Sequence, residues 1–140
     1  MGAILMFRKY HHLIYYCFPT AMNIAAFILW ILGAQDIYMA DQISTFAAFF
    51  SFAFNTFIAP VYMAILNGNI SNPGFIRKAV YSFLIISSNV AIHYLSWWIS
   101  TGMHFDAMTE LMMQFEFFFA CGIVFIPLAF QFFSSLSEKT

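Results

Sequence analysis

Four long apolar segments constrain the fold of this chain more than any other feature. They cover residues 13–33, 43–66, 80–99 and 111–133, and none of them contains Lys or Arg. A helix needs about 20 mostly apolar residues to cross the hydrocarbon core of a bilayer. Barrel strands are shorter and alternate apolar with polar residues. The sequence therefore predicts an all-α, polytopic membrane protein with four transmembrane helices in a single domain, residues 1–140.

The composition leads to the same class of protein. Hydrophobic residues form 63% of the chain and charged residues 8%, whereas a soluble domain carries about 25% charged residues. The formal net charge of −1 is opposite to the basic surface that nucleic-acid binding requires. We therefore expect membrane lipids as the surroundings and no nucleic acid as a partner. The first apolar run is too long for a cleavable signal peptide, and no Ala-x-Ala-like site follows it.

The charged residues predict the orientation in the membrane. Every basic residue precedes the first span, separates the second from the third, or follows the fourth: Arg8, Lys9, Arg77, Lys78 and Lys139. The loops on the other side carry only acidic charges: Asp36, Asp41, Asp106 and Glu110. Basic loops stay in the cytoplasm. The sequence thus predicts a multi-pass protein of the inner cell membrane with both termini in the cytoplasm.

The two halves of the chain, residues 8–70 and 76–136, resemble each other. Asn23 in the first span corresponds to Asn89 in the third, and Pro60 in the second corresponds to Pro127 in the fourth, at nearly the same separation. These matches predict two repeated hairpins in the same orientation. Parallel repeats recur in transporters, where the binding sites lie near the interface between the repeats.

Polar and small residues recur at helical spacing within each span and predict the faces that point into the bundle. They are Thr20 and Asn23 in the first span, Ser44, Ala48, Ser51, Asn55 and Ala59 in the second, Ser82, Asn89, His93, Ser96 and Ser100 in the third, and Thr109, Glu116, Ala120, Pro127, Gln131 and Ser134 in the fourth. Pro60 and Pro127 predict kinks, because proline removes a helical hydrogen bond. The Asn-, Gly- and Pro-rich stretch 67–74 predicts the turn between the second and third spans.

Glu116 is the one charged residue well inside a predicted span. It lies five residues from the outer end of that span, or about 8 Å deep, and His93 lies at nearly the same depth. The two can pair if their faces meet. An ionisable group at such depth is a candidate functional group, although such a pair can also simply lock the bundle. Likewise, Asn23, Asn55 and Asn89 could bind a polar headgroup or form hydrogen bonds between helices.

Nothing in the sequence indicates a metal or a cofactor. Cys17 and Cys121 lie in apolar runs without the spacing of a metal or redox motif. The histidines do not pair across two spans at one depth as a haem would require, and His93 with Glu116 is an incomplete ligand set. The sequence also lacks a phosphate-binding loop and a nucleophile beside a base. We therefore expect no metal, no cofactor and no enzymatic activity.

The layout resembles the GtrA-like family, small four-span membrane proteins associated with polyprenyl-phosphate-linked sugars and cell-envelope glycosylation. The resemblance rests on the basic pair 8–9, Asn23, the stretch 54–62, the basic pair 77–78 and Asn89. It covers nearly the whole chain as a pattern and not as a signature motif. It implies a lipid-linked sugar phosphate as the substrate.

The chain departs from this family after the second span. The family places a basic, aromatic run there, whereas this sequence has Ala59-Pro60-Val61-Tyr62 and no basic residue before Arg77. In this resemblance Arg77 and Lys78 are the nearest groups that could contact a lipid phosphate.

Two functions fit these features. The first is a small inner-membrane protein that assists translocation of an amphipathic, lipid-linked sugar substrate. Its polar part would contact Asn23, Asn55, Asn89, His93, Glu116, Arg77 and Lys78. The second is a non-catalytic membrane module, either an accessory subunit of a larger complex or an immunity protein against a pore-forming toxin. Four helices enclose little volume, so we expect a homo-oligomer or a complex with another membrane protein.

Overall fold

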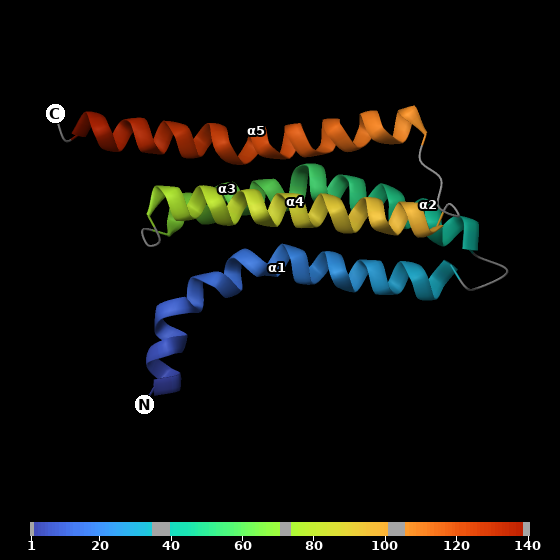
Figure 1. Cartoon of the computed structure of the whole chain (residues 1–140), viewed down its shortest axis with the longest axis horizontal. Helices are drawn as coiled ribbons and strands as arrows, with labels where there is room; N and C mark the ends of the chain where they lie inside the picture. Colours follow the sequence, from blue (N-terminus) through green and yellow to red (C-terminus); the bar gives the residue numbers. More distant parts are fainter. Residues whose placement is uncertain (1, 35–39, 71–73, 101–105, 139–140) are drawn as a thin grey trace.

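The computed structural model describes residues 2–34, 40–70, 74–100 and 106–138. These residues form α1 (Gly2–Ala34), α2 (Ala40–Ala53), the π-helical turn η1 (Phe54–Ile58), α3 (Ala59–Asn69), α4 (Phe75–Ser100) and α5 (Ala107–Glu138). Because α2, η1 and α3 are continuous, they make one long helix (Figure 1). Four helices in the described part are long and apolar enough to cross a membrane: Tyr10–Leu32, Phe46–Asn69, Phe75–Ile99 and Ala107–Glu138. The predicted spans are confirmed.

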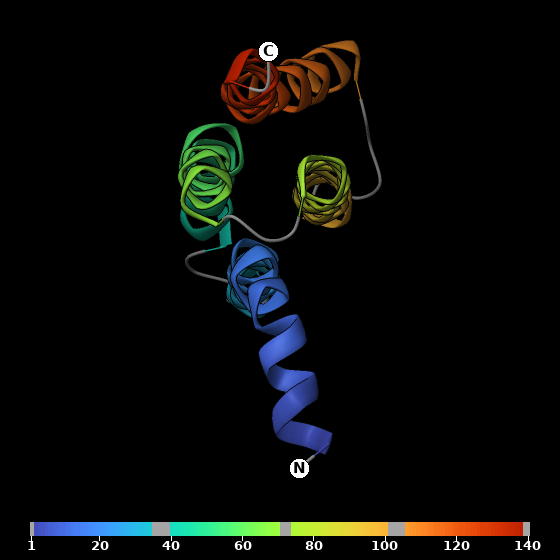
Figure 2. The ribbon, with the colours of Figure 1, turned by 90° about the vertical axis from the view of Figure 1, so that its left-hand side faces the viewer.

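Successive spans alternate in direction (Figure 1). As a result α1 begins and α5 ends at the same end of the bundle, where α3 also ends and α4 begins. We call this the basic end, because Arg77 and Lys78 lie in the first turns of α4. The bundle is a ring in which α1 lies beside α4, α4 beside α5, and α5 beside α3 (Figure 2).

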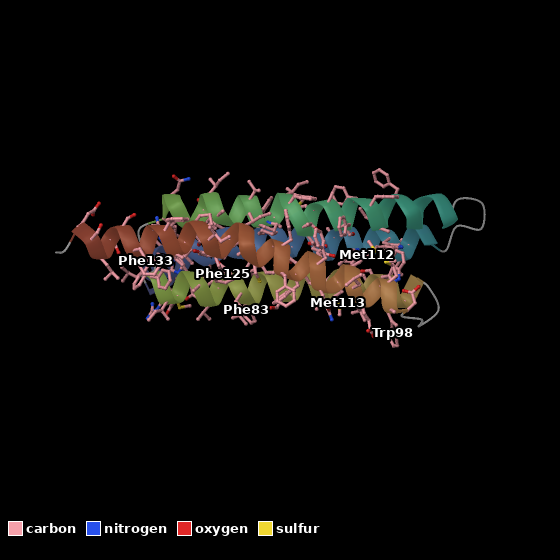
Figure 3. The ribbon with its side chains drawn as sticks, turned by 90° about the horizontal axis from the view of Figure 1, so that it is seen from above. Phe83, Trp98, Met112, Met113, Phe125 and Phe133 are labelled. Carbon is pink, nitrogen blue, oxygen red and sulfur yellow. The ribbon has the colours of Figure 1, made fainter. Side chains whose placement is uncertain are left out.

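Most of each span faces outward. Only between 17% and 33% of the most apolar stretch of each span is buried inside the bundle. Large apolar side chains project along its whole length (Figure 3), and Phe46 and Phe49 are 72% and 73% exposed. Water disfavours apolar area by about 25 cal/mol per Å², so this surface requires hydrocarbon around it. These features are compatible with a multi-pass membrane protein and not with a soluble domain.

A small apolar core holds the four spans together. Its buried members come from every span: Tyr16, Met63, Ile86, Val90, Tyr94, Ala120 and Val124. Lipid tails are as apolar as these side chains, so close packing and hydrogen bonds must hold the helices together. The buried polar residues described below are therefore important for the bundle as well as for any site.

The helix α1 contains Pro19, a proline for which the sequence analysis made no prediction. Pro19 has no N–H and leaves the carbonyl of Tyr15, four residues earlier, without its helical partner. The Tyr62 hydroxyl of α3 donates to this carbonyl oxygen at 2.8 Å. Only the first turns of α1 lead away from the bundle (Figure 1). The cross-helix bond thus supplies the partner that the proline removes.

The π turn keeps one face of the second span buried over its whole length. The buried residues Ser51, Asn55, Ala59, Met63 and Asn67 are each four positions apart. In a regular α-helix, four steps of four residues rotate by about 160° in total, which would carry the last residue almost to the opposite side. The π turn, in which the Ala59 N–H donates to the Phe54 carbonyl, inserts one residue. With this extra residue, the total rotation from Ser51 to Asn67 falls to about 60°.

Pro60 accounts for the position of this turn. It lies at the start of α3 and cannot donate to the Thr56 carbonyl. The ladder of hydrogen bonds is therefore already broken here, where a π turn disturbs it least. The helix α5, in contrast, continues through Pro127.

The buried face of α5 differs from the prediction. The helix buries Thr109, Glu116, Ala120, Val124 and Leu128, whereas Pro127, Gln131 and Ser134 are exposed. From Glu116 onward the buried residues follow a row of four-residue steps, which is inclined to the helix axis. A helix that packs along this row crosses its neighbours at an angle. Residues at seven-residue spacing follow a different line along the helix and therefore do not stay in contact with the neighbouring helices.

Asp106 caps the start of α5. Its Oδ1 accepts hydrogen bonds from the Thr109 hydroxyl and the Thr109 backbone N–H, each at 2.7 Å. These bonds, the side-chain bond first, hold the pKa of the Asp106 carboxyl below its ordinary value of 3.8. The cap is therefore complete above pH 3.8 and is lost only as the pH falls through the lower folded value.

Asp106→Ala is expected to fray the first turn of α5 at neutral pH, because it removes the acceptor for the Thr109 N–H. Asp106→Asn keeps an acceptor and is the matched control. Amide hydrogen exchange in detergent should be several-fold faster at Thr109 in the alanine variant alone. Equal exchange in both variants would show that the cap does not stabilise this turn.

Candidate functional site

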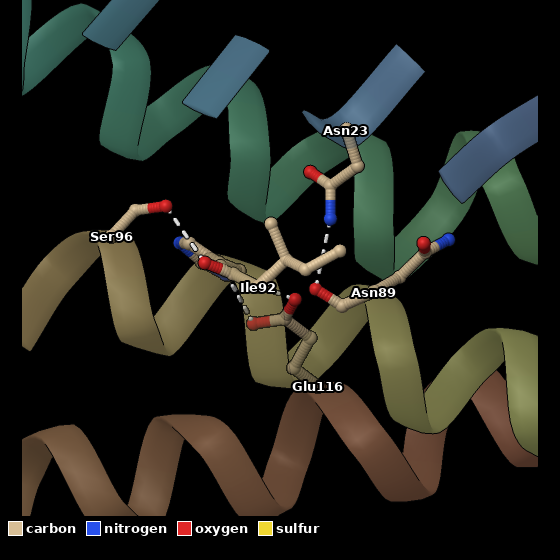
Figure 4. A network of polar contacts seen from close by, with 6 residues as sticks. Asn23, Asn89, Ile92, Ser96 and Glu116 are labelled. Atoms are coloured by element: carbon tan, nitrogen blue, oxygen red, sulfur yellow. Dashed lines mark hydrogen bonds and ion pairs between the residues drawn. The ribbon is translucent and has the colours of Figure 1, made fainter. Parts of the chain in front are cut away.

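His93 on α4 and Glu116 on α5 face each other inside the bundle. The Nδ1 atom of His93 lies 3.0 and 2.9 Å from the two carboxyl oxygens. The side chains are 4% and 0% exposed. The predicted pairing is confirmed (Figure 4). The hydrogen bond between imidazole and carboxyl gives each of these ionisable groups a partner inside the apolar bundle.

Aromatic side chains enclose this pair. The Tyr94 ring lies 4.6 Å from the His93 ring, centroid to centroid, and Tyr94 also forms a side-chain hydrogen bond with Glu116. The Trp30 ring lies 6.5 Å from His93, and its Nε1 atom is buried without a hydrogen-bond partner in the part of the chain described. The dry surroundings strengthen each polar contact. This arrangement can bind a ligand hydroxyl.

Asn23 and Asn89 join α1 to α4. The Asn23 amide donates to the Asn89 backbone carbonyl at 2.9 Å (Figure 4). Ser96, in contrast, donates to the Ile92 carbonyl of its own helix. The side-chain oxygen of Asn89 is buried and has no hydrogen-bond partner among the described residues, and the same is true of the Thr20 hydroxyl. Only some of the polar atoms of these two asparagines thus hold the helices together.

The π turn η1 carries buried polar groups that lack hydrogen-bond partners among the described residues. Asn55 and Thr56 are 3% and 0% exposed. Both amide atoms of Asn55 and the Thr56 hydroxyl have no hydrogen-bond partner within the described ranges. η1 packs against α5 and α4, the helices that carry the His93–Glu116 pair. An unpaired polar group in hydrocarbon costs several kcal/mol, and π turns are frequent at functional sites.

A second polar cluster lies at the basic end and centres on Asn67. Its side-chain oxygen accepts a hydrogen bond from the Tyr16 hydroxyl, and its amide donates to the Ser82 hydroxyl at 3.0 Å. Its backbone carbonyl accepts a hydrogen bond from the Lys78 ammonium at 2.8 Å. This one residue of α3 therefore joins α1 and α4. Lys78 is only 6% exposed, whereas its neighbour Arg77 points outward.

The structure thus brings together the predicted pair His93 with Glu116, and it also joins Asn23 to Asn89, a contact that the sequence analysis did not predict. Asn55 is buried as expected, but no described residue forms a hydrogen bond with its side chain. Lys78 belongs to the cluster around Asn67, and Arg77 does not enter the bundle.

Sequence reasoning missed Tyr16 and Asn67. The predicted turn 67–74 is wrong at its start, because α3 continues to Asn69 and Asn67 is 2% exposed. The physical reason is that the helix continues as long as its residues make buried contacts, and Asn67 makes the last of these. The polar Asn-Gly-Asn stretch ends the helix only after it. A signal existed for both residues. Tyr16 lies seven positions before Asn23, hence on the same helical face, and Asn67 continues the four-residue spacing of Asn55.

Comparisons with family models, with curated proteins and with solved structures found no match for this chain. The resemblance to the GtrA-like family therefore stays a prediction, and the function must be argued from the residues themselves.

Proposed function

We propose that this protein assists the translocation of an amphipathic, lipid-linked substrate, with a sugar as its polar part. The observation that carries the proposal is a line of buried polar residues through an otherwise apolar bundle. We call it the polar line: Asn67, Ser82, Asn23, Asn89, His93, Glu116, Asn55 and Thr56. A hydrophilic headgroup needs such partners to cross hydrocarbon, while its tail stays in the surrounding lipid.

The unpaired atoms of this line support transport over a purely structural role. A bundle that used polar residues only for cohesion would pair their atoms across helices. Here the amide of Asn55, the side-chain oxygen of Asn89 and the hydroxyl of Thr56 have no partner among the described residues. Sugar hydroxyls both donate and accept hydrogen bonds and would satisfy all of these atoms. The His93–Glu116 pair adds a group that can exchange a proton with the substrate.

The proposed repeat and orientation fit this role. Asn23 and Asn89, which correspond in the two halves of the sequence, contact each other across α1 and α4. Sites at the interface between repeats are typical of transporters. Basic residues in the first turns of α4 would place that end in the cytoplasm, where lipid-linked sugars are commonly assembled.

The alternative function, a non-catalytic membrane module, has one observation in its favour. Phe46, Phe50 and Phe54 stack in a row on the second span, with successive ring centroids 6.4 and 5.9 Å apart. Such a row could pack against helices of a partner protein. A partner that copurifies in a fixed ratio, together with no transport by the isolated chain, would favour this module.

Transport by the purified chain is the direct test. The protein would be reconstituted in vesicles that contain a fluorescent polyprenyl-phosphate sugar, and dithionite would bleach the label exposed on the outer leaflet. We expect more complete bleaching than in protein-free vesicles. Glu116→Gln and His93→Gln should each slow transfer at least about tenfold, since a hydrogen bond to an ionised group contributes 1.5–3 kcal/mol.

Glu110→Gln is the matched control. It makes the same chemical change on an exposed carboxyl of the same helix, so its transfer rate should equal that of the unmodified protein. If transfer persists unchanged in both polar-line variants, His93 and Glu116 have no part in the mechanism. If the unmodified protein transfers no label, the proposed function is wrong.

A further inference from the structure

Three groups that can carry positive charge converge at the basic end. α1 and α4 run in the same direction, and their register is fixed by two contacts: Tyr16 lies against Tyr81, with ring centroids 5.4 Å apart, and Asn23 bonds Asn89. Both contacts join residues that are 65 or 66 positions apart. The same register places His12 level with the Arg77–Lys78 pair.

The contacts of His12 agree with this placement. Its ring stacks on Tyr81, with centroids 6.1 Å apart and an angle of 29° between the rings. Arg77 lies four residues before Tyr81 on α4, hence one turn away on the same side of the helix. His12 is 7% exposed, and its Nε2 atom is buried without a hydrogen-bond partner in the described part of the chain. The imidazole therefore presents an unused polar atom beside two cations.

No carboxylate among the described residues neutralises this cluster. The ion pair among the described residues, His93 with Glu116, lies deeper in the bundle. The Lys78 ammonium donates one hydrogen bond, to the Asn67 carbonyl near the end of α3. This bond stabilises the C-terminal end of a helix, but it uses one of three N–H donors. A buried cation without an anionic partner is strongly unfavourable, so an anion from outside the chain would stabilise it.

We propose that His12, Arg77 and Lys78 form a binding site for the phosphate of a phosphorylated lipid. Phosphate suits this set of groups because lysine and arginine bind it through charge-assisted hydrogen bonds, and a histidine N–H adds a further donor. The site lies at one end of the spans, at the level of lipid headgroups. The inference deepens the proposed function and rests on it for the identity of the substrate, but the site can be tested by binding alone.

Calorimetry on the purified protein in an uncharged detergent tests the site. The probes are dihexanoyl phosphatidic acid, the matching diacylglycerol without phosphate, and inorganic phosphate. We expect phosphatidic acid to bind and the diacylglycerol not to bind. His12→Gln should weaken binding several-fold and Lys78→Gln about tenfold or more. Lys139→Gln, which removes the same charge outside the described residues, should leave binding unchanged.

The outcomes separate the alternatives. Tighter binding of phosphatidic acid than of inorganic phosphate identifies a lipid headgroup as the natural ligand, whereas equal binding supports a site for free phosphate. The Nε2 atom of His12 has no hydrogen-bond partner among the described residues. His12→Gln should therefore fold even if Lys78→Gln does not, and circular dichroism checks this. Unchanged binding in a folded His12→Gln and Lys78→Gln would overturn the site. Binding without transport would overturn only the proposed function, and transport without phosphate binding would overturn only this site.

Discussion

Glu116→Ala is expected to lower the free energy of unfolding by about 3–5 kcal/mol, the usual effect of breaking a buried ion pair. The substitution leaves the His93 Nδ1 atom and the Tyr94 hydroxyl without their acceptor. Glu116 is also 0% exposed, so the shorter side chain leaves a cavity at the contact between α4 and α5. Two separate losses therefore act at one position.

Denaturation of the protein in mixed micelles, followed by circular dichroism, measures this effect. Glu110→Ala is the matched control: the carboxyl of Glu110 is exposed on the same helix, so its loss should change stability by less than about 0.5 kcal/mol. Replacing both partners, His93→Phe with Glu116→Leu, should restore much of the stability, because the imidazole is then no longer left unpaired and only the Tyr94 hydroxyl lacks its acceptor. Equal stability of Glu116→Ala and Glu110→Ala would show that the pair contributes nothing to the fold.

Asn55→Leu is expected to act in the opposite direction. It replaces two buried amide atoms that have no partner among the described residues with an apolar side chain of similar size. The free energy of unfolding should rise by about 1–3 kcal/mol, the penalty for an unsatisfied buried group. If the amide serves to bind a headgroup, the same variant should lose transport. A gain in stability together with a loss of activity is the behaviour of a residue kept for function.

Gln114→Leu serves as the control for this experiment, because it makes a similar change at an exposed position of α5. It should leave transport unchanged. A destabilised Asn55→Leu would show that the amide has partners that hold the bundle together, and its role would then be structural.

The sequence predicted the helices well because length and composition alone decide which segments can span a bilayer. It also predicted the buried face of α4: Ser82, Asn89, His93 and Ser96 are all buried. That face was clear because each polar residue lies deep in an apolar span, where lipid leaves it no partner. The contact between His93 and Glu116 followed from their equal depth.

The buried face of α5 was harder to predict. Gln131 and Ser134 lie near the basic end, where a polar side chain can face either the interior or the headgroups, and both are exposed. Arg77 and Lys78 were treated as one unit, but neighbouring residues on a helix point about 100° apart. Lys78 is accordingly buried while Arg77 is exposed. Sequence adjacency is thus a poor guide to equal burial on a helix.

The prolines illustrate a further limit. Pro19, Pro60 and Pro127 all lie in predicted spans, but their effects differ with their surroundings. At Pro19 a tyrosine from another helix bonds the freed carbonyl, and at Pro60 a π turn precedes the proline. Whether the freed carbonyl is bonded by another helix or a π turn forms depends on the neighbouring helices, and a single sequence does not show these.

The π turn has a consequence for how this bundle tolerates change. Loss of one codon between Phe54 and Ile58 would remove the extra residue and restore a regular helix, while Met63 and Asn67 would stay on the buried face. Loss of one codon just after Pro60 would instead rotate everything after it by about 100°. Met63 and Asn67 would then leave the interior, and Tyr16, Ser82 and Lys78 would lose their common partner. The membrane would accept both segments, since their length and hydropathy would hardly differ, but only the first deletion would preserve the polar interior.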